Sequence, residues 1–184
     1  MKAFPGRGLI LLVALSLSGC AAVRGGGGGD GDAIDLTRMH LGQALAQGQI
    51  AVEPADPADA NNPEFASFAA AVERQLTRRG YTIAPARGST EQFARLDVRQ
   101  GTHGALTAGW PGVTPRRSNA SMVATLLDVR IQRRSDGTVF WQGRAVSEAA
   151  AGSAGAQRGA AVERLAEALF RDFPGESGRT IRAR

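Results

Sequence analysis

Residues 121–147 have the sequence SMVATLLDVRIQRRSDGTVFWQGRAVS, and this stretch decides the fold. Apolar and polar side chains alternate on both sides of Ser135-Asp136-Gly137, a composition typical of a tight turn. Alternation with a period of two places successive side chains on opposite faces of a strand. The stretch is therefore predicted to form an antiparallel hairpin with one buried face.

The length of the turn determines which residues face each other across the hairpin. A two-residue turn would place Trp141 opposite the polar Gln132, whereas a three-residue turn with Gly137 in the left-handed conformation keeps the apolar residues together. The two turns differ by one residue in register, and a shift of one residue moves every side chain of a strand to the other face of the sheet. We therefore expect the three-residue turn, which keeps the apolar side chains on one face. The pairs that it predicts are Ile131 with Trp141, Val129 with Gly143, and Leu127 with Ala145.

This register has two further consequences. Gly143 has no side chain, which leaves room on the buried face for the large ring of Trp141. On the outer face Asp128 lies opposite Arg144, an opposite-charge pair that stabilises a sheet by about 0.2–1 kcal/mol.

Two helices are expected, one on each side of the hairpin in the sequence. The first has Asn62 as its N-cap, Pro63 at its first position and Gly80 as the left-handed residue beyond its end. The second runs from about Gln157 to Asp172 and is ended by the Pro that follows. Their apolar stripes consist of Phe65, Phe68, Ala69, Val72 and Leu76, and of Val162, Leu165, Ala166, Leu169 and Phe173.

The remaining strands are shorter, and residues 101–118, rich in glycine and proline, are expected to form a loop. The order of the elements predicts a single α+β domain over residues 34–184, with a mostly antiparallel sheet and two helices covering one face. The other expected strands are residues 34–40, 49–53, 81–83, 93–100 and 180–181.

The N-terminus has the pattern of a secretory signal peptide, predicted to span residues 1–19. A basic start with Lys2 and Arg7 precedes the apolar run 9–17, which is too short to span a bilayer. Leu17, Ser18, Gly19 and Cys20 then resemble the bacterial lipobox, in which cleavage occurs before a cysteine that accepts a diacylglyceryl group. The sequence therefore predicts lipidation at Cys20.

A flexible tether is predicted over residues 20–33, because Gly25 to Gly29 cannot bury apolar surface and lose much entropy if ordered. Resemblance to the Gram-negative lipoproteins implies a multiply acylated, palmitate-bearing N-terminus, and more than one chain is needed for stable anchoring. In that class an Asp after the cysteine tends to retain the protein at the inner membrane. Ala21 therefore favours the periplasmic face of the outer membrane.

Composition excludes several classes of function. The chain of 184 residues has 22 Lys and Arg against 17 Asp and Glu, one cysteine and two histidines. Lys2 is the only lysine, so no phosphate-binding loop with a Gly-Lys-Ser/Thr motif exists, and neither a nucleophile elbow nor a zinc-protease motif occurs. We therefore expect no catalytic residues, no cofactor and no metal.

The two histidines and the two tryptophans are the candidates for chemistry. His40 ends a strand and is expected to be a hydrogen-bonded structural residue. His103 lies in the predicted loop; it is expected to be solvated, with catalysis as the minor alternative. Trp110 leaves two alternatives open, an exposed contact residue or a cap over the core, whereas Trp141 is expected to pack in the core.

Most of the basic residues are arginines, and they raise the question of an anionic partner. The pairs Arg116-Arg117 and Arg133-Arg134 lack interleaved aromatic residues, unlike nucleic-acid stacking platforms. An exported protein meets lipopolysaccharide and peptidoglycan, so we expect no nucleic-acid partner. A solvated arginine surface and a binding site for an anionic envelope component both remain open.

Three segments together resemble a bacterial lipoprotein family catalogued as domain of unknown function 4136. They are residues 37–40 with 50–54, residues 133–145, which contain Trp141 and Gly143, and residues 172–175, which contain Phe173 and Pro174. The resemblance covers nearly the whole chain after Cys20 and implies fold and location. It implies no reaction, because the activity of that family is unassigned.

The expected function is accordingly a lipid-anchored, non-enzymatic module for interaction or assembly in the cell envelope. Its partners would be outer-membrane lipid, held through the acylated N-terminus, and envelope proteins or anionic glycopolymers. A binding module for lipopolysaccharide or peptidoglycan is one alternative, and a periplasmic hydrolase is the second.

Overall fold

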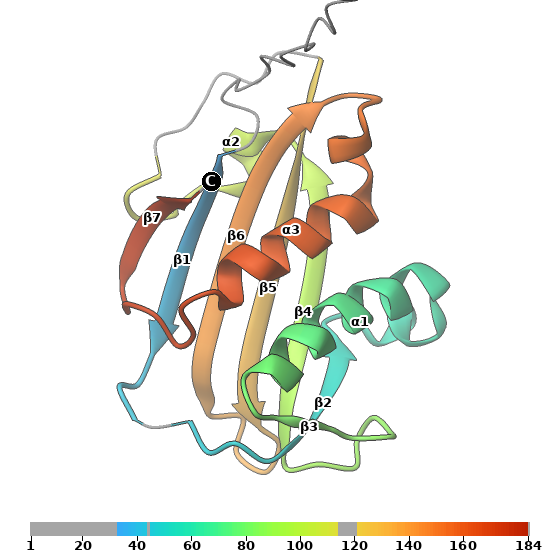
Figure 1. Cartoon of the computed structure of the whole chain (residues 1–184), viewed down its shortest axis with the longest axis vertical. Helices are drawn as coiled ribbons and strands as arrows, with labels where there is room; N and C mark the ends of the chain where they lie inside the picture. The colour runs from blue at the N-terminus through green and yellow to red at the C-terminus, as the bar shows by residue number, and fades with distance from the viewer. Residues whose placement is uncertain (1–32, 44, 114–120, 184) are drawn as a thin grey trace, which may run out of the picture.

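The computed structural model describes residues 33–43, 45–113 and 121–183, and Figure 1 shows their arrangement. Seven strands form one sheet in the order β3-β2-β4-β5-β6-β1-β7. The helices α1 and α3 lie in front of this sheet in the view of Figure 1. The elements are β1 (Ile34–His40), β2 (Gln49–Pro54), the 3-10 helix η2 (Pro57–Asn61), α1 (Pro63–Arg78), β3 (Thr82–Ile83), β4 (Gln92–Gly101), α2 (His103–Leu106), β5 (Met122–Arg133), β6 (Val139–Ala150), the 3-10 helix η3 (Ala154–Ala156), α3 (Arg158–Phe170) and β7 (Arg179–Ala183).

The prediction of an α+β fold with a mostly antiparallel sheet is confirmed, with two differences. The sheet is mixed, because β2 runs parallel to both β3 and β4. The prediction of two helices omitted α2, which begins at His103 within the segment expected to be a loop. Thr102 caps α2 by accepting a hydrogen bond from the backbone N–H of Ala105. No helix among the described residues has the length and apolarity that crossing a bilayer requires.

The hairpin has the predicted register over most of its length. Ile131 pairs with Trp141, Val129 with Gly143, Leu127 with Ala145 and Asp128 with Arg144. Beyond Ile131 the register shifts, since Gln132 pairs with Val139, so β6 carries one extra residue next to the turn. Gly137 has the expected left-handed conformation, with φ of 70°. Such bulges are frequent beside hairpin turns, and alternation alone does not reveal them.

The first predicted helix begins and ends as its sequence indicates. The side chain of Asn62 accepts a hydrogen bond of 2.9 Å from the backbone N–H of Glu64, and Gly80 has φ of 89° beyond the end. The second helix, α3, ends at Phe170, two residues earlier than predicted. Phe173 lies in the turn that follows and packs against the main core.

The main core lies between the sheet and the helices α1 and α3. Trp141 is at its centre with no exposed surface, and its ring centroid lies 5.2 Å from that of Phe170 and 5.1 Å from that of Phe173. Its indole N–H donates a hydrogen bond of 2.9 Å to the carbonyl of Pro174. The expected core position of Trp141 is confirmed.

A smaller core covers part of the opposite face of the sheet. It contains Trp110, Leu126 and Val146, with Leu106 of α2 packed against them. Neighbouring residues such as Leu127 and Ala145 belong to the main core, so the two cores lie on opposite faces. Of the two alternatives for Trp110, the structure shows the core cap, since the residue is only 9% exposed.

Gly143 provides a test of the packing around Trp141. A Cβ at this position would lie 2.3 Å from Cη2 of Trp141 and 2.8 Å from Cδ1 of Leu169. We expect Gly143→Ala to lower the free energy of unfolding by about 1–3 kcal/mol, the usual cost of overpacking a core. Urea unfolding followed by tryptophan fluorescence measures it.

Gly159→Ala is the matched control, because a Cβ on this α3 residue would have no atom within 4 Å. We expect that variant to keep or raise the free energy of unfolding, by up to about 1 kcal/mol. Equal effects of the two alanine variants would contradict the packing role of Gly143.

Candidate functional site

The residues predicted to carry lipidation and sorting, Leu17, Ser18, Gly19, Cys20 and Ala21, lie outside the described residues. The same is true of the arginine pair at 116 and 117. The structure therefore does not test these predictions. It does place the other candidates, His40, His103 and the arginines 133 and 134.

His40 has the structural role that its position at a strand end suggested. Its Nε2 donates a hydrogen bond of 2.9 Å to the carbonyl of Gly175, and its Nδ1 accepts one of 3.1 Å from the N–H of Gly42. The ring thus joins the end of β1 to the segment that precedes β7. Both ring nitrogens have backbone partners, which leaves neither available as a base.

Arg38, two residues earlier on β1, joins the same segments from inside the core. Its Nε donates to the carbonyl of Leu169 at 2.8 Å and its Nη2 to that of Ala168 at 3.0 Å, so it caps the last turn of α3. Burial lowers the pKa of the Arg38 guanidinium, while the charge of Asp172 acts in the opposite direction. Gly175, with φ of 78°, leaves the space that the Arg38 side chain occupies.

The prediction that His103 is solvated is wrong. His103 begins α2, is 1% exposed, and its Nε2 lies 3.3 Å from Oδ2 of Asp35 on β1. Nδ1 is buried and has no hydrogen-bond partner within residues 33–43, 45–113 and 121–183. Sequence reasoning missed this contact because the two residues are 68 positions apart and lie on separate elements.

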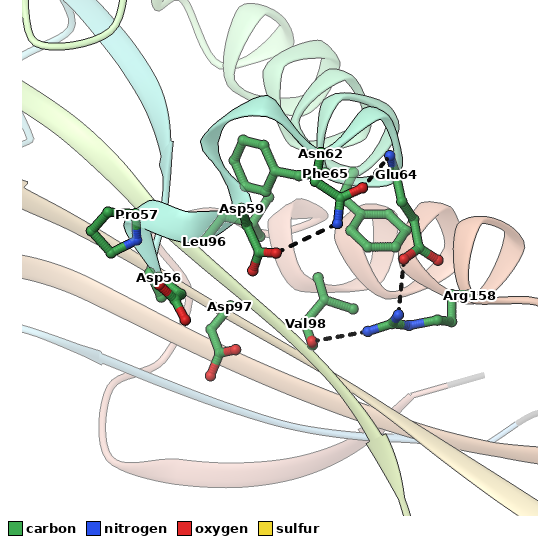
Figure 2. Close-up of a pocket in the computed structure, with 12 residues that line it drawn as sticks. Asp56, Pro57, Asp59, Asn62, Glu64, Phe65, Leu96, Asp97, Val98 and Arg158 are labelled. Carbon is green, nitrogen blue, oxygen red and sulfur yellow. Dashed lines mark hydrogen bonds and ion pairs between the residues drawn. The ribbon is translucent and has the colours of Figure 1, made fainter.

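Figure 2 shows a cleft of about 430 Å³ at the end of β2, between η2, the first turn of α1, β4 and the start of α3. Four carboxylates line it together with a single cation, Arg158. Pro57, Phe65 and Phe68 contribute apolar lining. The carboxylates are those of Asp56, Asp59, Glu64 and Asp97.

Each of these carboxylates already has a structural role. Asp56 caps η2, Asp59 accepts a hydrogen bond from Asn62, and Glu64 is 2.9 Å from Arg158. Asp97 pairs with Arg99 at 3.1 Å. Across the described part of the chain, no group of three or more histidine or acidic side chains is placed to hold a metal ion. The cleft is therefore a charged junction between elements.

A second cluster lies on the side of the sheet opposite α1 and α3, on strands β4, β5 and β6. We call the part of this side that the smaller core leaves open the uncovered face. Its centre is the carboxylate of Asp128, whose side chain is 4% exposed. Arg144 donates from Nε to Oδ2 at 2.8 Å, Gln142 donates from Nε2 at 3.0 Å, and Arg130 donates from Nε at 3.3 Å. The sequence predicted Arg144 as a partner and missed the other two.

The remaining arginines of the hairpin stabilise its turn region. Arg133 pairs with Asp136 at 2.8 Å, and Arg134 with Glu53 at 2.5 Å. The Arg134 guanidinium also lies over the ring of Phe93, 4.4 Å from its centroid. These arginines therefore have acidic partners within the domain.

Comparison with known proteins gives one sequence relative and several similar folds. No family model matches the chain. It is 25% identical over 208 aligned residues to an uncharacterized protein of Zymomonas mobilis, covering 80% of this chain and 78% of that protein. Among solved structures, a PDZ domain protein from Parabacteroides distasonis matches with a TM-score of 0.53 and 11% identity. That match covers 82% of this chain and 38% of the larger protein, and it concerns the fold alone.

A second similar solved structure comes from Bacteroides thetaiotaomicron. It is a domain of unknown function 4136 family protein. Its TM-score is 0.41 at 14% identity, with 76% of this chain and 95% of that chain covered. This is the family that the three sequence segments resemble.

The pKa of Glu53 provides a test of the contacts around the hairpin turn. Burial acts to raise this pKa, but hydrogen bonds from Arg134 and from the N–H of Gly88 outweigh it and hold the pKa below its usual value. A carboxyl with a lowered pKa stabilises the fold above its unfolded pKa near 4.5, and this stabilisation is lost as the pH falls through the lower folded value.

We expect Glu53→Gln to lower the free energy of unfolding at pH 7 by about 1 kcal/mol and to have less effect below pH 4. Urea unfolding at a series of pH values measures the difference. Glu167→Gln, at an exposed position of α3, is the control and should leave the free energy of unfolding unchanged both at pH 7 and below pH 4. A difference between Glu53→Gln and the wild-type protein that does not vary with pH would contradict the role of the Glu53 charge.

Proposed function

We propose that the chain is a lipid-anchored protein of the bacterial cell envelope, whose domain over residues 34–184 acts as a non-enzymatic module for interaction or assembly. Residues 1–19 would be removed, Cys20 acylated, and Ala21 would direct the protein to the periplasmic face of the outer membrane. The observation that carries the proposal is the lipobox at the end of a short apolar run. Membership of the domain of unknown function 4136 family is part of the same proposal.

The places of the ionisable side chains favour a binding module over an enzyme. His40 and Asp128 use their polar atoms on neighbouring groups of the domain. His103 pairs with a carboxylate, as a general base would, but at 1% exposure it offers a substrate no access. A hydrolase acting through His103 therefore has no support from this arrangement.

The start of the domain also fits a tethered module. β1 begins at Ile34, directly after the glycine-rich segment, and in Figure 1 this strand lies near the C-terminal edge of the sheet. A flexible spacer of 14 residues has a root-mean-square length of about 20 Å. The domain would therefore stay close to the bilayer while remaining free to turn toward partners.

Lipidation is tested by Cys20→Ala. In the wild-type protein, mass spectrometry should find an N-terminal peptide that begins at Cys20 and carries lipid mass. The variant lacks the thiol that accepts the lipid, so it should lose that mass and disappear from the outer-membrane fraction. Ser18→Ala, which keeps a small residue before the cleavage site, is the control and should be processed as the wild type. A wild-type peptide without lipid would refute the anchoring proposal.

Sorting is tested separately by Ala21→Asp. In the lipoprotein class that the N-terminus resembles, an acidic residue after the cysteine retains the protein at the inner membrane. We expect the variant to keep its lipid and to move from the outer-membrane to the inner-membrane fraction on a sucrose gradient. Ala22→Asp places the same charge one residue later and serves as the control. Unchanged outer-membrane recovery of Ala21→Asp would contradict the sorting role of this position.

A further inference from the structure

The uncovered face has more positive than negative charge at its centre. Arg95 and Arg130 are cross-strand neighbours there, and Asp97 and Asp128 form the next pair on the same face. With Arg99 and Arg144 included, the four arginines and two aspartates of this set carry a net charge of +2, and two further carboxylates of the face, Glu53 beside Arg95 and Glu148 on β6, lie around it. Elsewhere several exposed arginines have one carboxylate each, as in the pairs Arg74–Glu163 and Arg179–Glu176. The centre of this face therefore attracts anions.

Arg144 holds a guanidinium group with free donors at this centre. Only its Nε bonds to Asp128, and its two terminal nitrogens have no hydrogen-bond partner among the described residues. The side chain is 38% exposed and lies over the ring of Trp110, 5.8 Å from its centroid. Asp128 and Trp110 thus fix the orientation of the group. A fork held in this way presents two parallel donors, the geometry that a carboxylate accepts.

Beside Arg144 is a small pocket of about 90 Å³. Gln142 donates from Nε2 to both carboxylate oxygens of Asp128, so its amide oxygen points away from Asp128 and can act as an acceptor. Pro111 and Trp110 form one side of the pocket, and Met39, 48% exposed, forms another. The complete lining is Thr37, Met39, Trp110, Pro111, Gln142 and Arg144.

We propose that the uncovered face binds a carboxylated polysaccharide chain, with a carboxylate on the terminal nitrogens of Arg144 and a sugar ring in the pocket beside Trp110. This inference rests on the proposed envelope location and assigns a ligand class to the module. Arg95 and Arg130 lie one pair further along β4 and β5 and would meet a second carboxylate of the same chain. The strand positions 95, 130 and 144 thus form a path across the sheet.

The chemistry of the face favours a polysaccharide over a protein partner. The centres of protein interfaces are depleted of Asp, Glu and Lys, whereas the centre of this face contains the carboxylates of Asp97 and Asp128. Met39 is the exposed large apolar residue next to the pocket. The Arg144 guanidinium and the Gln142 amide are planar groups whose donors and acceptors suit the carboxylate and hydroxyl groups of a sugar chain. Trp110 provides an apolar contact for the sugar ring.

The test uses the full chain, extracted in a non-ionic detergent, and isothermal titration calorimetry at low ionic strength. The probes are polygalacturonate, which is a carboxylated polysaccharide, dextran, which is a neutral one, and poly-L-glutamate, which is an acidic polypeptide. We expect polygalacturonate to bind at least tenfold more tightly than either other polymer. Its affinity should fall as salt is added, because the charges lie at the surface.

Two variants test the assigned residues, with one matched control. Arg144→Gln and Arg95→Gln should each weaken polygalacturonate binding at least tenfold, because each removes the charge-assisted hydrogen bonds of one guanidinium to a carboxylate. Arg95 bonds only to the backbone carbonyl of Ala55 among the described residues, so its loss leaves the centre of the face intact. Arg74→Gln removes an exposed arginine, paired with Glu163, from helix α1 and should leave the affinity unchanged.

The assignment is overturned by any of three results. The first is that polygalacturonate fails to bind at low salt. The second is that poly-L-glutamate binds as tightly as polygalacturonate, which would assign the face to an acidic polypeptide. The third is that Arg74→Gln weakens binding as much as Arg144→Gln and Arg95→Gln do. Thermal unfolding checks each fold, and Arg95→Gln decides the outcome if Arg144→Gln is destabilised. Because the binding assay does not depend on the lipid, loss of anchoring in Cys20→Ala and loss of polymer binding are separate results.

Discussion

The contact between the Trp141 indole and the end of α3 is the interaction on which the described domain depends. The ring fills the space between the sheet and the aromatic pair Phe170 and Phe173, and its N–H holds the carbonyl of Pro174. Gly143 on the same strand has no side chain, and the Trp141 ring occupies the space that a Cβ there would need. Sheet, helix and the segment leading to β7 are therefore joined at one residue, whose burial alone stabilises the fold by a few kcal/mol.

Residues 37–40, 133–145 and 172–175, which carry most of the resemblance to a known family, come together around this contact. The first contributes Arg38, which caps α3, and the second contributes Trp141. The third contributes the carbonyl of Pro174, which accepts the hydrogen bond from Trp141, and Gly175, whose backbone lies close to the Arg38 side chain. Each of these residue types is required by packing or by backbone geometry at its own position. The resemblance therefore resides in the structural framework of the domain, which is why it indicates a fold and does not indicate a reaction. The uncovered face lies on the other side of the sheet.

Local patterns in the sequence predicted where most helices and strands lie. They did not predict which strands pair with each other in the sheet. The register of the hairpin follows from the alternation on each side of Asp136-Gly137, and the start of α1 follows from Asn62. Local periodicity does not encode which distant strands pair, so the parallel placement of β2 beside β4 was not foreseen. Helix α2 was missed because it has only four residues, from His103 to Leu106, within a stretch rich in glycine.

The candidate sites show the same limit. Asp128 and Arg144 were recognised because they face each other in a predicted hairpin. The contact of His103 with Asp35 could not be foreseen, since it joins residues from the second helix and the first strand. Arg38 occupies a buried strand position where an apolar residue is the usual expectation, and its partners are backbone carbonyls, which no sequence pattern reveals.

The order of the sheet has a consequence for how the chain folds as it is synthesised. β1 and β2 are consecutive in sequence, yet three strands, β4, β5 and β6, separate them in space. β1 pairs only with β6 and β7, so the first strand has no partner until residues 141–147 have emerged. Loops of this length close slowly, and an unpaired strand edge is prone to association with other chains. The first strand that the structure describes is therefore among the last to be paired, and the emerging chain needs protection until the hairpin is complete.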